Sequence, residues 1–414
     1  MPIFGGGNEL FRQMLGDIVK MMPGAGSKWL LAEQMATEIA GSGDDPGPDP
    51  ITRIELEQLS GIAALHVNEI GGVPPPSGGG ARLLPTSRRD WARRTLATWR
   101  PVLDRLSQAL PDGGAVAGDG GGAPGDLGAG DGGGAPGDLG AGDGHAEADD
   151  AMGALLSQWA TAMFPMMTAM QVGSVAGHLA ERALGPYDVP LAPVPGDEIF
   201  VPSHNLEAIA SDWTLPLSDL RLWLCVHELA YHAVLSRPAV AETLAALVVE
   251  HAERVRPDPE ALGELLAGAD PADPAALARI FGDPAALGAS EDSPELKSVR
   301  SRLDALTAAI AGYGEHVTSV AAGRLIGTQA PIGEAMRRRR VGRGEGEKVA
   351  ERLFGLSLDQ AQIDRGERFV RGVLERSGDV ELAHMWLGAE SFPTPSEVDA
   401  PGLWLARVNL PKAP

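Results

Sequence analysis

Two histidines and a glutamate stand together in a strongly apolar segment of this 414-residue chain. Residues 220–236 carry His227, Glu228 and His232 among side chains that are almost all apolar. A helix that is apolar on every side is buried, and burying ionisable groups costs free energy unless they are paired or bind a metal. These three residues are therefore the first candidates for a functional site.

Their spacing is close to the His-Glu-x-x-His pattern, in which two histidines bind zinc and the glutamate activates a water molecule. Histidines four residues apart lie about 40° apart around a helix, so both reach one ion. Here Tyr231 holds that position, and His232 follows it, about 140° from His227 on an ideal helix. A π-bulge could bring both histidines to one metal. We name His227 and His232 as candidate metal ligands and Glu228 as the candidate catalytic base.

The same spacing also has a purely structural interpretation. Glu228 and His232 are four residues apart on the expected helix and could form a charged pair. His227 and Tyr231 have the same spacing and could share a hydrogen bond. The pattern alone leaves the zinc site and the paired core residues both open.

The elements that must position these residues are mostly helices. Helical periodicity and the breakers Pro and Gly predict one around the candidate site, at 218–236. Further helices are expected at 8–22, 27–40, 51–70, 88–110, 151–184, 239–255, 258–267, 273–280, 295–325, 330–340, 345–355, 358–377, 380–388 and 395–400. One short strand is expected at 198–202. The fold class is mainly α, with little β structure.

A Gly- and Asp-rich segment divides the chain. Residues 112–150 hold nine acids and neither Lys nor Arg, and one twelve-residue unit occurs twice in tandem, at 118–129 and 130–141. Such a segment buries too little apolar area to offset its ordering entropy, so we expect a disordered linker. The expected organisation is a helical part at 1–111 that packs on the main body, the linker, and the main domain at 151–414.

Composition excludes several classes of protein. Acidic residues outnumber basic ones by 56 to 34, which argues against a nucleic-acid binder. The run Arg337–Arg340 is expected to be a solvated face or a set of internal salt-bridge partners. The single cysteine, Cys225, excludes an internal disulfide. We see no secretory signal and no uniformly apolar stretch of 18 residues, and we expect a cytoplasmic protein without a membrane span.

Several motifs together resemble one known family. They are Leu184–Leu191, Asp212–Trp223, His227–Pro238, Glu334–Arg340, Arg365–Arg371 and Phe392–Trp404. The sequence is similar over roughly residues 150–410 to the zincin-like metallopeptidase family of actinobacteria, a family of zinc-dependent hydrolases. The resemblance implies a zincin-like helical metallopeptidase fold and hydrolysis of peptide bonds in a peptide or protein substrate.

Only some of the family's site residues have matching residues in this sequence. His227 matches the first zinc ligand, Glu228 the general base, and His232 an adjacent second histidine. The place of the second ligand falls on Tyr231. The place of the third falls on Ala311, one turn before Glu315 and His316, which could substitute for it.

Two functions therefore stay open. The first is a zinc-dependent peptidase that is weakly active or inactive because Tyr231 replaces a ligand. The second is a pseudo-peptidase that binds a peptide or protein partner without cleaving it. We expect well below one zinc per chain, because loss of ligands from a three-ligand site weakens metal binding.

Overall fold

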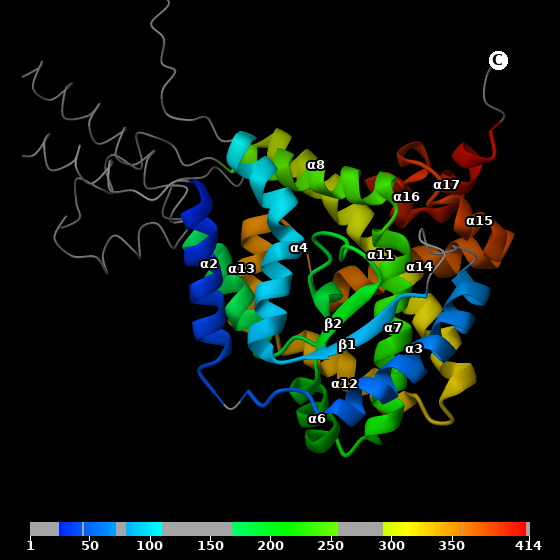
Figure 1. Cartoon of the computed structure of the whole chain (residues 1–414). Helices are drawn as coiled ribbons and strands as arrows, with labels where there is room; N and C mark the ends of the chain where they lie inside the picture. Colours follow the sequence, from blue (N-terminus) through cyan, green and yellow to red (C-terminus); the bar gives the residue numbers. More distant parts are fainter. Residues whose placement is uncertain are drawn as a thin grey trace, which may run out of the picture.

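The computed structural model describes residues 25–43, 45–71, 80–109, 168–255, 293–357 and 359–410. The helices expected at 8–22, 258–267 and 273–280, the linker at 112–150 and the first half of the helix expected at 151–184 lie outside these residues. The described part of the chain is mainly α-helical, as predicted (Figure 1).

The helices follow the expected order. The N-terminal part contains α2 (Ala25–Ala40), α3 (Pro50–Gly71) and α4 (Arg88–Ala109). The middle contains helical residues 168–180, the short 3₁₀ turn η1 (Pro186–Asp188), α6 (Ser203–Asp212), α7 (Leu217–Leu235) and α8 (Pro238–Arg254). The last part contains α11 (Pro294–Leu325), α12 (Ala330–Val341), α13 (Glu345–Phe354), α14 (Gln360–Ser377), α15 (Asp379–His384), η2 (Ala389–Ser391), α16 (Pro395–Asp399) and α17 (Pro401–Val408). The sequence did not predict α6 or α17, and α15 is shorter than expected.

The small sheet corrects the prediction of a single strand. The expected strand is β2 (Glu198–Pro202), and it pairs in parallel with β1 (Arg82–Thr86). Arg82 Nη2 donates to Glu198 Oε1 at 2.8 Å across the pair. Proline is tolerated at sheet edges, and in a two-stranded sheet both strands are edges, so Pro85 is compatible with β1.

Helix α7 lies in the middle of the core. From Leu224 to Leu235 every one of its residues is buried, because α3 and α11 pack against it and η1 covers part of its length. In Figure 1, α3, α7 and α11 lie next to one another beside the sheet. Burial of an apolar helix by neighbours on several sides is what its sequence predicted.

Helices α11 and α14 approach each other closely. A Cβ atom added at Gly366 would lie 1.9 Å from the Ala308 carbonyl oxygen, so only glycine fits at this crossing. The contact fixes α14 against the C-terminal half of the core, where α16 and α17 also pack (Figure 1).

Within the described residues, no single helix has the length and apolarity needed to cross a membrane. Only α7 and α8 taken together pass that test, and they are bent by 82° at the break between them.

Candidate functional site

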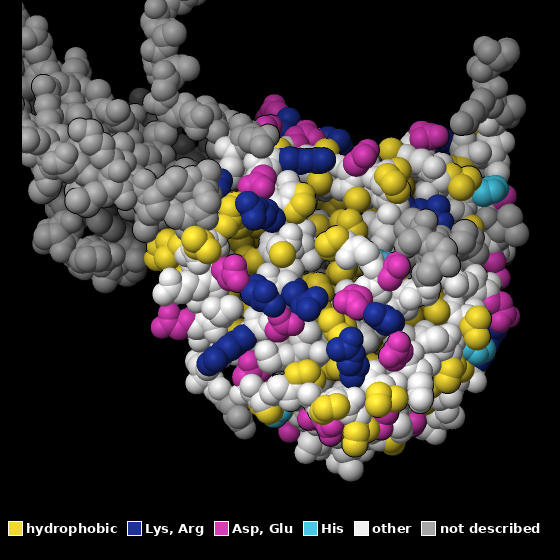
Figure 2. Space-filling view, in the orientation of Figure 1, with side chains coloured by type: hydrophobic (Ala, Val, Ile, Leu, Met, Phe, Trp, Pro, Cys, Tyr) yellow, Lys and Arg dark blue, Asp and Glu magenta, His cyan; other side chains and the backbone are white. Residues whose placement is uncertain are grey.

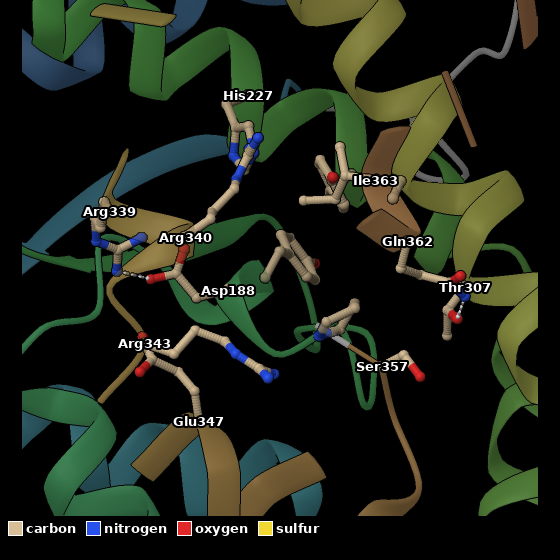
Figure 3. A pocket seen from close by; sticks show the side chains of 14 residues that line it. Asp188, His227, Thr307, Arg339, Arg340, Arg343, Glu347, Ser357, Gln362 and Ile363 are labelled. Carbon is tan, nitrogen blue, oxygen red and sulfur yellow. Dashed lines mark hydrogen bonds and ion pairs between the residues drawn. The ribbon is translucent and has the colours of Figure 1, made fainter. Parts of the chain in front are cut away.

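A pocket with both charged and apolar lining lies where η1, α7, α11, α12, α13 and α14 meet (Figure 3). It spans about 750 Å³, including the space open to solvent. Its wall is formed by Tyr187, Asp188, Pro190, His227, Tyr231, Thr307, Ala311, Arg339, Arg340, Arg343, Glu347, Ser357, Gln362 and Ile363.

His227 lies in this wall with both ring nitrogens close to carboxylates. Its Nδ1 is 3.2 Å from Glu228 Oε1, and its Nε2 is 3.5 Å from Glu315 Oε1. The ring stacks on Trp223, with centroids 4.9 Å apart and planes 23° apart. These contacts hold the imidazole in one orientation on α7.

The charge on His227 follows from these contacts. Burial lowers the pKa of His227, but the neighbouring Glu228 and Glu315 carboxyls outweigh burial and raise it to about 9. The ring is therefore protonated at neutral pH.

Glu315 is the carboxylate on which three side chains converge. Its Oε1 accepts from the Tyr231 hydroxyl at 3.5 Å, lies near His227 Nε2 and forms an ion pair with Arg340. Burial raises the pKa of Glu315, but Arg340 and His227 together lower it to about 2. The sequence named Glu315 as a possible substitute ligand, and the structure brings it to His227.

Glu228 is enclosed rather than exposed to the pocket. It is 0% exposed, and a Cβ atom added at Gly185 would lie 2.2 Å from its carboxyl carbon. Its Oε2 is buried without a hydrogen-bond partner, and burial raises its pKa. Its carboxyl group does not belong to the pocket wall.

His232 lies apart from His227, in a separate set of contacts. The Tyr187 hydroxyl is 2.6 Å from its Nδ1, and Ser236 Oγ is 3.2 Å from the same nitrogen. Burial lowers the pKa of His232 to about 4, so the ring is neutral and accepts from Tyr187. Helix α7 is a continuous α-helix through this region, without the π-bulge that would join the two histidines. The anticipated Glu228–His232 pair is not formed, because Glu228 contacts His227.

Two arginines of α12 form internal salt bridges, as the sequence allowed. Arg339 Nη2 is 2.8 Å from Asp188 Oδ2, which also accepts from the Leu184 backbone N–H at 2.8 Å. Arg340 pairs with Glu315. The neighbouring Arg338 is more exposed and pairs with Glu334 on its own helix.

Sequence reasoning missed Asp188 and Arg343 as pocket residues. Asp188 stands in a motif that resembled the family, and that motif was the available signal. Arg343 follows the arginine run after a single Val-Gly pair and carries no separate signal.

The three places that the resemblance assigned to zinc ligands do come together. His227, Tyr231 and Ala311 all line the pocket. Only the first carries a usual zinc donor, and its nitrogens face carboxylates. Within the described ranges, no three His, Cys, Asp or Glu side chains are arranged to hold a metal. His316 does not line the pocket. Burial lowers the pKa of His316 overall, although the charge of Asp379 raises it in part. The residues present do not fit a zinc centre.

Comparison with known proteins agrees with this architecture. The chain is similar to a solved structure from Chloroflexus aurantiacus described as a "putative hydrolase with a novel fold", with 20% identity and a TM-score of 0.59 over 92% of this chain and 99% of that one. No curated protein matches the chain. The family model of the zincin-like metallopeptidases matches residues 28–405. The chain thus belongs to the zincin-like metallopeptidase family.

Proposed function

We propose that this protein is a pseudo-peptidase, a zincin-like protein that keeps the pocket of its family and binds a peptide without hydrolysing it. The observation that carries the proposal is the pair Tyr231 and Ala311. Both line the pocket at the places of the second and third ligands, and neither side chain is a usual zinc donor.

A positive charge is already present where the pocket meets Glu315. The Arg340 guanidinium pairs with this carboxylate, and the Tyr231 hydroxyl and the protonated His227 also approach it. A divalent ion beside these groups would have to compete with the Arg340 guanidinium for the Glu315 carboxylate. This protein-made cluster supports a pocket that is stable without metal.

The position of Glu228 supports the loss of hydrolysis. A general base must come within hydrogen-bond reach of the water that it activates, directly or through one more water molecule. Glu228 is fully buried behind Gly185, and its carboxyl lies outside the pocket wall. We therefore assign Glu228 the role of a structural partner of His227.

Restoring the missing ligands tests this proposal. The double variant Tyr231→His, Ala311→Glu places histidines at 227 and 231 on one helix face and a carboxylate at the third place. We expect its melting temperature to rise on adding Zn²⁺, because a ligand that binds only the folded state stabilises it. The parent should not respond.

The triple variant that adds His227→Ala is the matched control, and its zinc response should be lost. A parent that responds as strongly as the double variant would mean that a complete metal site already exists and would overturn the pseudo-peptidase. If none of the three proteins responds, the assignment of the three ligand places is wrong.

A further inference from the structure

We propose that this pocket binds the carboxylate of a peptide, held by the guanidinium groups of Arg340 and Arg343. This inference rests on the proposed peptide-binding function and names the group that the pocket recognises. It follows from hydrogen-bond donors that have no protein acceptor, from the charges of the pocket wall, and from the apolar part of the same wall.

The two guanidinium groups have donors to spare. Arg340 contacts Glu315 through Nη2, and Arg343 contacts Glu351 through Nη1. Among the described residues, the other N–H groups of both side chains have no protein acceptor. The side chains are only 18% and 24% exposed. None of their nitrogens is among the fully buried atoms without a partner, so the remaining N–H groups are open to the pocket or to solvent and can donate to a bound ligand.

The acceptors in the pocket wall are partly used by other protein groups. Asp188 already accepts from Arg339 and Leu184, and Glu347 accepts from the Gly344 backbone N–H at the start of α13. On the opposite side, Ser357 donates to Asp304 and Gln362 donates to Thr307. In Figure 3, the Arg340 side chain points toward His227 and Arg343 reaches toward the middle of the pocket.

The charge balance favours a carboxylate over a phosphate. Arg340 and Arg343 each already pair with one carboxylate, Glu315 and Glu351. In the pocket wall itself, three arginines (Arg339, Arg340 and Arg343) stand against the carboxylates of Asp188 and Glu347, which leaves a surplus of one positive charge among these five groups. So small a surplus suits a singly charged anion better than a dianion. Arginine also presents parallel N–H groups that match the two oxygens of a carboxylate.

The apolar part of the wall favours a ligand that carries an apolar group next to its anionic group. Pro190, Ala311 and Ile363 line the same pocket, together with the rings of Tyr187 and Tyr231. A free phosphate or acetate would leave this surface unused. A peptide end, with a carboxylate next to a side chain, would cover both parts of the wall.

The experiment uses the full chain and three pools of N-acetylated tripeptides with mixed sequences. The first two pools contain neither Asp nor Glu; the first has a free C-terminal carboxylate, and the second has a C-terminal amide. The third is amidated but carries Asp or Glu in the middle. After equilibrium ultrafiltration, mass spectrometry counts the retained peptides. We expect at least about tenfold more retention of a carboxylate-bearing pool than of the amidated neutral pool, as for a charge-assisted pair.

Three variants test whether the retained peptides bind in this pocket. Arg343→Gln should remove the preference, and Arg340→Lys should reduce it while keeping a charge beside Glu315. Arg338→Gln is the matched control, because Arg338 belongs to the same arginine run, pairs with Glu334 and lies outside the pocket wall. It should retain peptides as the parent does.

Preference for the first pool identifies a C-terminal carboxylate, and preference for the third identifies an acidic side chain. Equal retention of the charged and neutral pools, or a preference that survives Arg343→Gln, would overturn the carboxylate inference and leave peptide binding intact. Retention of no pool would overturn the inference as well. None of these results depends on zinc. The peptide test can therefore fail while the zinc response of the Tyr231→His, Ala311→Glu variant comes out as expected, and the reverse.

Discussion

At the scale of single residues, His227 decides the character of the site. In a zinc peptidase this histidine must be neutral and offer a lone pair to the metal. Here it lies between Glu228 and Glu315 and is protonated at neutral pH. A histidine that the resemblance matches to the first zinc ligand thus contacts two carboxylates in this structure.

The raised pKa of His227 predicts a pH dependence of stability. Its folded-state pKa is about 9, against 6.5 for a free imidazole. The stabilisation is therefore complete below pH 6.5 and is lost as the pH rises through 9. Urea unfolding at pH 6.5 and pH 9.5 should show a loss on the order of 3 kcal/mol in the parent. His227→Gln should be less stable at pH 6.5 and flatter across this range. Equal slopes for the two proteins would contradict the assignment.

The sequence identified the residues of α7 and one partner, Glu315, but not how the other charged groups pair. Ionisable groups in an apolar helix are visible in the sequence, so His227, Glu228 and His232 were found. The spacing also showed that the two histidines diverge. Arg340 and Asp188 could not be found in this way, because their burial depends on how α12 and η1 dock.

At the scale of elements, the crossing of α11 and α14 fixes the pocket wall. Ala311 of α11 and Gln362 and Ile363 of α14 line the pocket next to this crossing. Side chains at the closest approach would push the helices apart. Glycine at 366 is therefore part of what shapes the site.

Alanine substitutions test the crossing. Gly366→Ala would place a Cβ 1.9 Å from a backbone oxygen of α11, so we expect a loss of about 1–3 kcal/mol or more in the free energy of unfolding. Gly333→Ala on α12 is the control, because nothing lies within 4 Å of its Cβ position. It should be neutral or gain about 0.5–1 kcal/mol through the unfolded state. Similar effects of both changes would contradict the close approach.

Helix limits were more predictable than pairing. The expected helix 218–236 is observed at Leu217–Leu235, because proline and serine mark its ends. Strand β1 was missed because Arg82–Thr86 gains its hydrogen bonds from Glu198–Pro202, more than a hundred residues later. Five residues with a proline at the fourth position carry no strand signal of their own.

At the scale of the whole molecule, the N-terminal helices complete the core around α7. Ser60 of α3 accepts from the Leu83 backbone N–H at 2.9 Å and lies 3.7 Å from Cys225 of α7. Tyr313 of α11 donates to the Gly71 carbonyl at 2.7 Å. Basic and acidic side chains are interspersed over the face in Figure 2. Buried contacts between distant segments therefore join the described parts of the chain.

These contacts predict how the chain behaves when it is divided. Residues 151–414 alone should aggregate or melt without cooperativity, because loss of α3 exposes the apolar α7. Co-expressed with residues 1–111, they should form a complex that co-purifies. This follows because the composition of 112–150 predicts no contribution to the core. Size-exclusion chromatography and thermal melts provide the measurement. A stable, monomeric 151–414 fragment would contradict the prediction.

The central claim is that this zincin-like chain holds its pocket together without zinc. The most direct measurement is the metal content of the protein, purified without chelators or added metal, by inductively coupled plasma mass spectrometry beside His227→Ala. We predict well below one zinc per chain in the parent and no further loss in the variant. Near-stoichiometric zinc in the parent that disappears in His227→Ala would contradict the account.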